Sequence, residues 1–184
     1  MGHAASLLVL GDSLSAGYGM EPQYGWVNLL QQRLTDHKYP YKIVNASISG
    51  STTSQGLTRL PELLTKHKPN IVIIQLGGND GLRGLPISVI RNNLLNLIEM
   101  STQQKAKILL VGVRLPPNYG ATYTNQFQAI YADLAKQEEI AVVPLFLTGI
   151  DEKTELMQDD GIHPRMAAQT LLLDNIWPQL KTLL

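Results

Sequence analysis

A serine, an aspartate and a histidine in this sequence have the types and surroundings that nucleophilic catalysis requires. Ser13 lies in the stretch Gly-Asp-Ser-Leu-Ser, and Asp160 precedes His163 by three positions in Asp-Gly-Ile-His. Such catalysis needs a hydroxyl, a base that takes its proton, and a carboxylate that orients the base. We therefore predict that Ser13 is the nucleophile, that His163 is its general base, and that Asp160 fixes the tautomer of His163.

Two further polar clusters contain groups that can donate hydrogen bonds to a developing oxyanion. Gly50 ends the stretch Asn-Ala-Ser-Ile-Ser-Gly, and Asn79 lies in Gly-Gly-Asn-Asp. We predict an oxyanion hole formed by the backbone N–H groups of Ser13 and Gly50 and by the side-chain amide of Asn79. Because Gly50 has no Cβ, its backbone would be able to approach the substrate closely.

Short apolar runs alternate along the chain with longer segments that have helical spacing. The runs lack polar alternation, which is typical of strands buried on both faces, and lie at residues 6–10, 42–46, 71–76, 108–113 and 140–143. Helical spacing covers residues 26–34, 57–67, 89–100, 127–137 and 166–184. Pro61 and Pro178 fall within two helical segments, which we expect to be kinked there or to begin later. The alternation predicts an α/β fold: a three-layer α/β/α sandwich around a five-stranded parallel sheet with the flavodoxin-like order 2-1-3-4-5.

The polar clusters follow the predicted strands, so the parallel sheet would bring them together at the carboxyl ends of its strands. Three of them follow the first, second and third predicted strands, and ligands of open parallel sheets bind beside the carboxyl ends of the strands. His163 lies between the fifth predicted strand and the closing helix, where Pro164 suits the first helical turn. The sequence therefore predicts that Ser13, Gly50, Asn79 and His163 meet at one edge of the sheet.

Length and composition exclude several classes of protein. The 184 residues fit one domain, residues 1–184. Because 15 basic residues balance 15 acidic ones, the chain has no net positive charge that would attract nucleic acid. The lack of cysteine excludes a thiolate nucleophile and a cysteine-ligated zinc. The apolar run at residues 7–10 is too short to span a membrane, so we expect no stable membrane insertion. We interpret residues 1–3 as a tag remnant in place of a removed leader.

Each cluster taken alone also fits an ordinary structural role. Ser13 could cap a helix, and Gly50 and Asn79 could be turn residues. We assign Asp12 and Asp80 to holding their own loops through bonds to backbone N–H groups. The order of the clusters, each beside a predicted strand end, favours catalysis over these roles. Purely structural roles remain for two surface histidines and two packing tryptophans, His37, His67, Trp26 and Trp177.

Two other functions fit parts of the pattern. A phosphoacceptor receiver domain shares the predicted strand order, but it needs a lysine closely after the fifth strand, where this chain has Pro-Leu-Phe-Leu-Thr at residues 144–148. Metal-assisted hydrolysis could use four side chains as ligands, namely Asp12, Asp80, Asp160 and His163. Activity that resists a chelator would separate the serine mechanism from the metal mechanism.

The blocks around Ser13, Gly50, Asn79 and His163 resemble those of the SGNH subgroup of GDSL hydrolases, whose four blocks carry Ser, Gly, Asn and His. The agreement extends through residues 76–84 and 157–164 and covers essentially the whole chain. Within the family, the likeness is greatest to bacterial periplasmic esterases that also act as thioesterases and lysophospholipases. The resemblance implies the triad Ser13, Asp160 and His163, the oxyanion hole described above, neither cofactor nor metal, and a periplasmic or secreted location.

The resemblance also implies the reaction and its substrates. We expect a serine esterase that hydrolyses short- to medium-chain carboxylic esters, acyl thioesters and lysophospholipids through an acyl-enzyme on Ser13. Its partner would be a small acyl substrate, and we expect a monomer. Short connections leave no segment for a large lid, so we expect a small open cleft. Residues 80–86 should shift when an acyl chain binds, with Leu82 and Leu85 against the chain.

Overall fold

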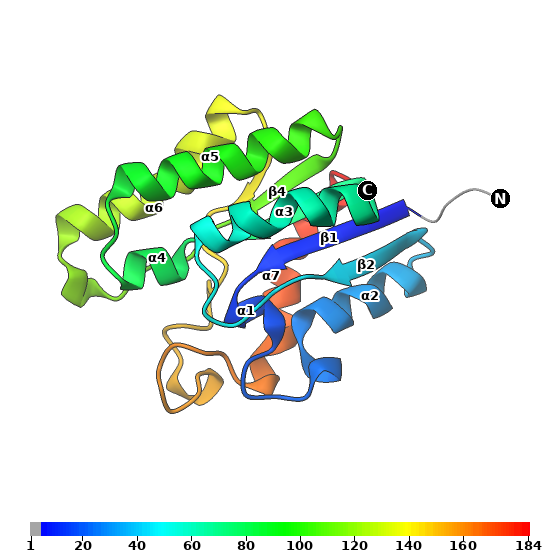
Figure 1. Ribbon diagram of the computed structural model, residues 1–184. Helices are drawn as coiled ribbons and strands as arrows, with labels where there is room; N and C mark the ends of the chain where they lie inside the picture. The colour runs from blue at the N-terminus through cyan, green and yellow to red at the C-terminus, as the bar shows by residue number, and fades with distance from the viewer. Residues whose placement is uncertain (1–4) are drawn as a thin grey trace.

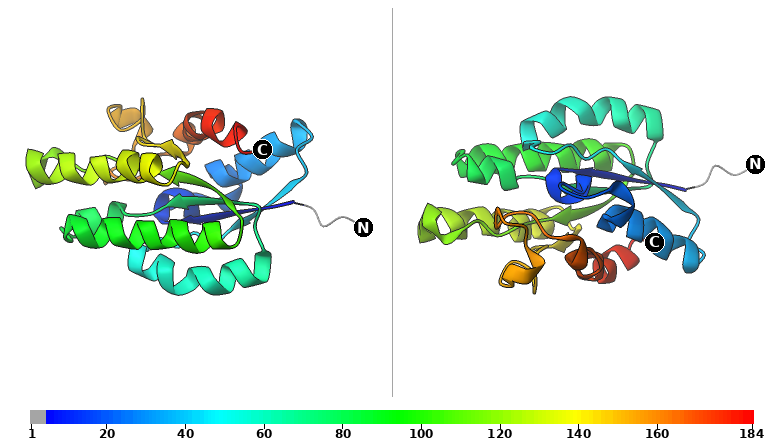
Figure 2. Two further views of the ribbon diagram at one scale, coloured as in Figure 1. Left: turned by 90° about the horizontal axis from the view of Figure 1, so that it is seen from above. Right: turned by 90° about the horizontal axis from the view of Figure 1, so that it is seen from below.

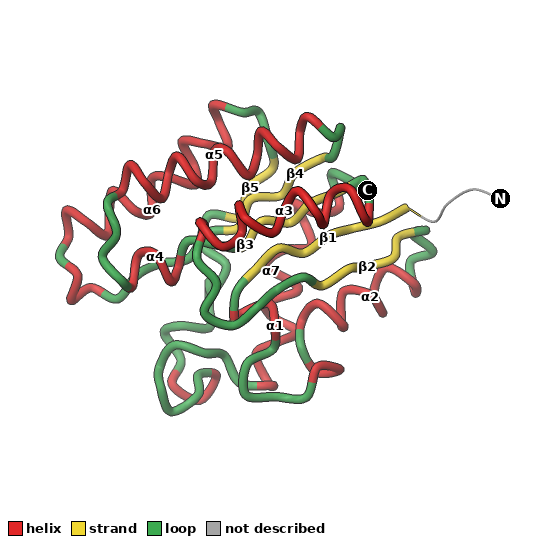
Figure 3. The backbone as a smooth tube through the Cα atoms, in the orientation of Figure 1, coloured by secondary structure: helices red, strands yellow, loops and turns green. Residues whose placement is uncertain are grey.

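The computed structural model describes residues 5–184, which form a five-stranded parallel sheet (Figures 1 and 3). Its strands are β1 (Ala5–Gly11), β2 (Tyr41–Asn45), β3 (Ile71–Gln75), β4 (Lys107–Val111) and β5 (Ala141–Val143). Their order across the sheet is β2-β1-β3-β4-β5, and every neighbouring pair is parallel. The predicted fold class and strand order are confirmed. The interpretation of residues 1–3 lies outside the described residues.

Helices cover both faces of the sheet (Figure 2). On one face lie α3 (Thr53–His67) and α5 (Ile87–Gln103); on the other lie α2 (Trp26–Asp36), α6 (Ala121–Gln137) and α7 (Gln169–Lys181). Two short helices, α1 (Ser13–Ala16) and α4 (Gly78–Leu82), follow β1 and β3 closely. Single 3₁₀ turns occupy Pro22–Tyr24, Pro117–Tyr119, Thr154–Leu156 and Met166–Ala168. Within residues 5–184, no helix combines the length and the apolar character needed to cross a membrane.

The burial of each strand follows its place in the sheet. All of β3 is buried, and β1 and β4 are buried over most of their length. In contrast, β2 is only half-buried, and Lys42 and Asn45 are exposed. The prediction that every strand is buried on both faces is therefore wrong for β2, and β5 is also partly open. Both strands lie at an edge of the sheet, where one side has no neighbouring strand.

The helix α3 begins four residues before the apolar pattern predicts. Thr52 and Gln55 form a capping box, in which the hydroxyl of Thr52 accepts from the N–H of Gln55 and the side chain of Gln55 accepts from the N–H of Thr52. Pro61 lies inside this helix, so the expectation of a later start is wrong for α3. It is right for the closing segment, where α7 begins at Gln169 with Pro178 inside it.

One side chain covers the outer edge of β2. The side-chain amide of Gln31, on α2, donates to the carbonyl of Tyr41 at 3.1 Å and accepts from the N–H of Ile43 at 2.9 Å. A neighbouring strand would use the same two backbone groups. The amide of Gln31 thus pairs with β2 on the side that faces away from β1.

Candidate active site

Ser13 lies beyond the carboxyl end of β1, as the first residue of α1 (Figure 1). Asp12 is the N-cap of this helix, and its Oδ1 accepts a hydrogen bond from the N–H of Leu14 at 3.0 Å. Ser15 joins α1 to β3, because its hydroxyl donates to Oε1 of Gln75 at 2.6 Å. Asp12 therefore holds the turn that presents Ser13, as predicted.

A closed turn between β5 and α7 presents His163. Met157 and Pro164 form an antiparallel bridge, and the N–H of Gln158 donates to the carbonyl of His163 at 2.7 Å. Gly161 has a φ of +66°, a left-handed conformation that glycine adopts without steric cost. The turn thereby places His163 beside α1, although Ser13 and His163 are 150 residues apart in sequence.

Asp160, His163 and Ser13 form a continuous chain of hydrogen bonds. Nδ1 of His163 lies 2.6 Å from Oδ2 of Asp160, and Nε2 of His163 lies 2.8 Å from Oγ of Ser13. Oδ1 of Asp160 also accepts from the backbone N–H groups of Ile162 and His163, at 2.9 and 3.0 Å. The imidazole bond first, and then the backbone bonds, lower the pKa of Asp160 to about 2. An ionised Asp160 can therefore orient an imidazole that takes a proton from Ser13.

The other two predicted oxyanion residues occupy different positions relative to the site. Asn79 is the second residue of α4 and lines the cavity beside Ser13. Its Nδ2 donates to the carbonyl of Ser51 at 3.0 Å and lies 3.5 Å from Oδ2 of Asp12. Gly50, immediately before Ser51, is exposed and is not among the cavity-lining residues. A Cβ on Gly50 would meet open space, so its φ of +80° is what requires glycine there.

Asp12 carries a buried carboxyl group directly beside the site. Only 3% of the residue is exposed, and this burial raises its pKa to about 6. The N–H of Leu14, the side chain of Gln75 and the charge of His163 oppose the rise less strongly. Asp12 is thus the less acidic of the two carboxyl groups near His163, and Asp160 the more acidic.

A cavity of about 470 Å³ opens beside Ser13. Its apolar lining comes largely from the segment after β4 and from residues 147–162, and includes Val113, Leu115, Pro116, Pro117, Leu147, Met157 and Ile162. Arg114 also lines the cavity, 3.6 Å from the carboxylates of Asp151 and Glu152. Sequence reasoning missed these walls. Their signal is the apolar run at residues 108–113, which continues two residues past the end of β4.

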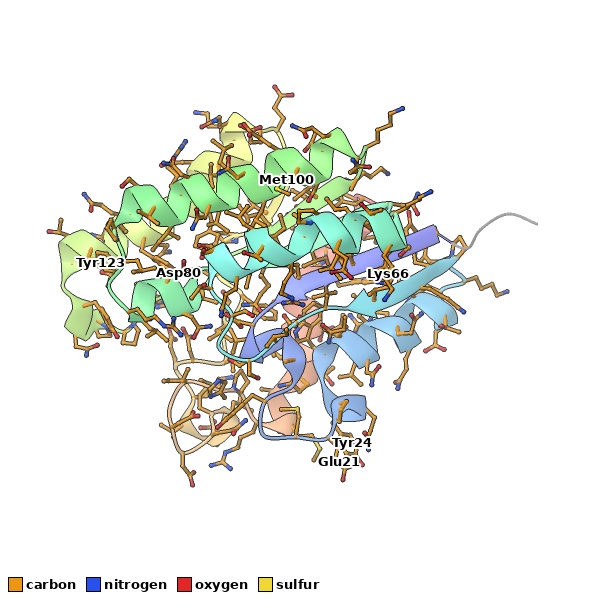
Figure 4. The ribbon with its side chains drawn as sticks, in the orientation of Figure 1. Glu21, Tyr24, Lys66, Asp80, Met100 and Tyr123 are labelled. Carbon is orange, nitrogen blue, oxygen red and sulfur yellow. The ribbon has the colours of Figure 1, made fainter. Side chains whose placement is uncertain are left out.

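Of the two leucines predicted to contact an acyl chain, only one lines the cavity. Leu82 lines the cavity, whereas Leu85 packs against the core and is absent from the cavity walls. The predicted loop at residues 80–86 is helical as far as Leu82, where α4 ends. Two tyrosine hydroxyls hold this segment. Tyr119, on the 3₁₀ turn at Pro117–Tyr119, donates to the carbonyl of Leu82 at 2.6 Å, and Tyr123, on α6 (labelled in Figure 4), donates to the carbonyl of Leu85 at 2.6 Å.

Asp80 does not hold its own loop, which corrects the prediction for this residue. Its carboxylate accepts from the N–H of Thr53 at 3.0 Å and from the hydroxyl of Thr53, so it joins α4 to the start of α3 (Figure 4). Within residues 5–184, no three side chains of His, Asp or Glu gather as metal ligands would. Asp80 and Asp12 are instead engaged with Thr53 and with the cap of α1.

The structure agrees with the packing roles of Trp26 and Trp177 and with the surface position of His37, whereas His67 is half-buried at the end of α3. Trp26 is fully buried, and its indole N–H donates to the carbonyl of Leu14 at 3.2 Å. Trp177 packs against the core, with the exposed ring of His37 at 5.5 Å between centroids. Tyr18, which sequence reasoning did not select, stacks on His163 at 4.2 Å between ring centroids.

An open parallel sheet that brings a serine after β1 into hydrogen-bond contact with a histidine after β5 is an arrangement found in α/β serine hydrolases. The match to a family model agrees with this class. The chain belongs to the GDSL-like Lipase/Acylhydrolase family, whose model matches residues 9–171.

Particular relatives match almost the whole chain. It is 51% identical to Esterase TesA of Pseudomonas aeruginosa over 181 aligned residues, and the alignment covers 98% of this chain and 90% of that protein. It is 44% identical over 180 aligned residues to the Escherichia coli K12 protein named Thioesterase 1/protease 1/lysophospholipase L1. That alignment covers 98% of this chain and 85% of that protein. The crystal structure of TesA is similar with a TM-score of 0.95 and 51% identity, over 97% of this chain and 99% of that one.

Proposed function

We propose that this chain is a serine esterase that cleaves carboxylic esters through an acyl-enzyme on Ser13. The observation that carries the proposal is the hydrogen-bond chain from Ser13 through His163 to Asp160, at the side of a largely apolar cavity. Membership of an acylhydrolase family and the names of two relatives, an esterase and a thioesterase, support the same reaction.

The triad performs acyl transfer in two halves. Oγ of Ser13 attacks the acyl carbon while Nε2 of His163 takes the hydroxyl proton, and the ionised Asp160 stabilises the resulting imidazolium through its bond to Nδ1. The imidazolium then protonates the leaving alkoxide or thiolate as its bond to the acyl carbon breaks. In the second half, His163 takes a proton from the water that attacks the acyl carbon. As the bond between that carbon and Oγ breaks, the imidazolium returns the proton to Oγ, which releases the acid and restores both the Ser13 hydroxyl and the neutral imidazole.

The negative oxygen of each tetrahedral intermediate needs donors that are already in place. We assign this role to the N–H groups of Ser13 and Gly50 and to Nδ2 of Asn79. The support is the position of Asn79 in the cavity wall beside Ser13, where one N–H of Nδ2 donates to the carbonyl of Ser51 and the other has only a weak contact, at 3.5 Å, with Oδ2 of Asp12.

The cavity suggests the substrates. Its volume of about 470 Å³ and its apolar lining suit a short or medium acyl chain lying against Leu82. The name of the Escherichia coli relative extends the proposal to acyl thioesters and lysophospholipids. We also propose that the protein is an exported monomer, periplasmic or secreted, that acts on small acyl substrates and uses neither cofactor, metal nor nucleic acid.

The test begins with the nucleophile. Ser13→Ala should abolish turnover of a short aryl ester while the circular dichroism spectrum stays that of the parent. A fluorophosphonate should attach to Ser13 of the parent, as mass spectrometry of the digest would show. Ser49→Ala is the matched control, because Ser49 is an exposed serine in the loop after β2, and it should keep full activity and labelling.

Three results would contradict the proposal. They are normal turnover by Ser13→Ala, labelling at another serine, and a rate that EDTA abolishes and added divalent metal restores. The last result would favour the metal-assisted alternative, since a serine nucleophile needs no metal.

A further inference from the structure

The ring of Tyr18 covers one face of His163. The two ring centroids are 4.2 Å apart and the planes are tilted by 32°. The neighbours of His163 are partly exposed to water: the side chain of Asp160 is 37% exposed, and Tyr18 is 49% exposed. Among residues 5–184, Tyr18 is the aromatic side chain that contacts the imidazole. The imidazole thus has a carboxylate at its edge and an aromatic ring on its face.

The position of Tyr18 is built into the two loops of the site. Its N–H donates to the carbonyl of Ser13 at 3.2 Å. Its carbonyl accepts from Nε2 of Gln158 at 2.9 Å, and the same nitrogen lies 3.1 Å from the carbonyl of Pro164. Gly19 has a φ of +76°, and a Cβ there would come within 2.5 Å of Oε1 of Gln158. Gln158 therefore ties the Tyr18 loop to the turn that presents His163.

We propose that Tyr18 is a positioning residue that stabilises, through its π face, the imidazolium that His163 becomes during acyl transfer. This rests on the proposed function. The proton that leaves Oγ of Ser13 arrives on Nε2, so positive charge appears on a ring whose face already lies against Tyr18. A cation on an aromatic face is stabilised by the negative quadrupole of the ring. The neutral imidazole gains less from this contact, so the contact strengthens in the transition state.

The other charged groups around His163 act from different directions. Asp160, in the same turn as His163, is hydrogen-bonded to Nδ1 at the edge of the imidazole. Asp12, at the end of β1, interacts with His163 through its charge. Removing the aromatic face while leaving both carboxylates in place therefore isolates the contribution of Tyr18.

Tyr18→Phe and Tyr18→Leu form the matched pair that tests the proposal. Phenylalanine keeps the aromatic face, while leucine keeps an apolar cover without it. A cation–π contact at an exposed site corresponds to about a two- to fivefold change. We expect Tyr18→Leu to lose about two- to fivefold in kcat with unchanged KM, and the acid limb of its kcat/KM profile to move to lower pH. Tyr18→Phe should behave as the parent.

A second readout needs no turnover. NMR titration of His163 in the resting protein should give a midpoint about 0.3–0.7 pH unit lower for Tyr18→Leu than for Tyr18→Phe, which is the same two- to fivefold change expressed as proton affinity. Tyr24→Leu is the control, because Tyr24 is an exposed tyrosine on the 3₁₀ turn at Pro22–Tyr24 (Figure 4). It should change neither kcat nor the midpoint.

Equal midpoints in the leucine and phenylalanine variants would overturn the proposal, and so would an equal loss of kcat in both. A loss in Tyr24→Leu as large as that in Tyr18→Leu would also overturn it, because the effect would then belong to the loop as a whole. Failure of the proposed function looks different. In that case Ser13→Ala keeps its activity, whereas the midpoint difference between the two Tyr18 variants still decides the role of the ring.

Discussion

The side-chain amide of Asn79 has two N–H groups, and the resting structure uses them unequally. One donates to the carbonyl of Ser51 at 3.0 Å, while Oδ2 of Asp12 is 3.5 Å from the same nitrogen. A bond at that length is weak, so the second N–H can turn to an oxyanion without giving up a strong partner. The bond to Ser51 meanwhile fixes the nitrogen, and not the oxygen, of the amide on that side.

Replacing Asn79 should therefore slow the reaction and leave binding almost unchanged. Loss of one oxyanion donor typically costs about 10²–10³ in kcat, so we expect Asn79→Ala to fall in that range with a similar KM. Asn79→Asp should be slower still near neutral pH, because a carboxylate offers no donor and repels the developing charge. Steady-state kinetics with a short aryl ester measure both. A kcat within a few-fold of the parent, or a loss mainly in KM, would make Asn79 a turn residue only.

Asp12 gives the free energy of unfolding a dependence on pH. Its pKa in the folded protein is about 6, above the ordinary 3.8, because burial disfavours the charged carboxylate. The folded state therefore gains stability from the protonated group below about pH 4 and loses it as the pH rises through 6. An asparagine at this position accepts the same bond from Leu14 but carries no charge at any pH.

We expect Asp12→Asn to gain stability relative to the parent between pH 4 and pH 8 by about 2 kcal/mol, somewhat less than the full free energy equivalent of the pKa change, because the carboxyl of the unfolded chain is already partly ionised at pH 4. Urea unfolding at both pH values measures the difference. Performing it in a His163→Gln background removes the imidazole whose charge interacts with Asp12. A stability difference that does not vary with pH would show that the carboxyl group titrates normally.

At the scale of the elements, the apolar pattern predicts the buried strands and the buried parts of the helices, but it misses helix ends that are made of polar residues. The five strands are predictable because β1, β3 and β4 are almost continuous Ile, Leu and Val. The first turns of α3 and α6 carry few apolar residues, so both helices begin earlier than the pattern indicates. The capping box of Thr52 and Gln55 was readable in the sequence, whereas α6 begins after Gly120 without any side-chain cap.

Asp80 couples two elements, and its loss should be felt in stability. The carboxylate is fully buried and accepts two hydrogen bonds from Thr53, the first residue of α3. Asp80→Ala leaves a buried N–H and a hydroxyl without this partner, which corresponds to about 2–4 kcal/mol in the free energy of unfolding. Urea unfolding measures the loss. Asp133→Ala, on the exposed side of α6, is the control and should change stability by less than about 0.5 kcal/mol. Equal stability of the two variants would deny the coupling.

At the scale of the whole molecule, the meeting of distant segments followed from topology. Parallel strands place their carboxyl ends at one edge, so Ser13 and Asn79 were predictable as neighbours before any contact was known. Strand order does not place β5 beside β1, because β3 and β4 lie between them, so the long segment between β5 and α7 must bring His163 back to Ser13. The contact of Tyr18 with His163 could not be predicted, because it depends on how two loops lie against one another, whereas the cavity wall at Val113 had a signal in the apolar run that continues past β4.

The amide of Gln31 has a consequence for the behaviour of the protein in concentrated solution. An open sheet has free edges, and an unpaired edge strand is a template on which another chain can add a strand. Gln31→Ala would leave the carbonyl of Tyr41 and the N–H of Ile43 free for such intermolecular pairing. We expect this variant to aggregate with rising concentration in light scattering, and Gln32→Ala, one exposed residue further along α2, to stay dispersed. If both variants scatter alike, the edge is guarded by something else. If only Gln31→Ala aggregates, one side-chain amide sets how concentrated the protein can become before its molecules join edge to edge.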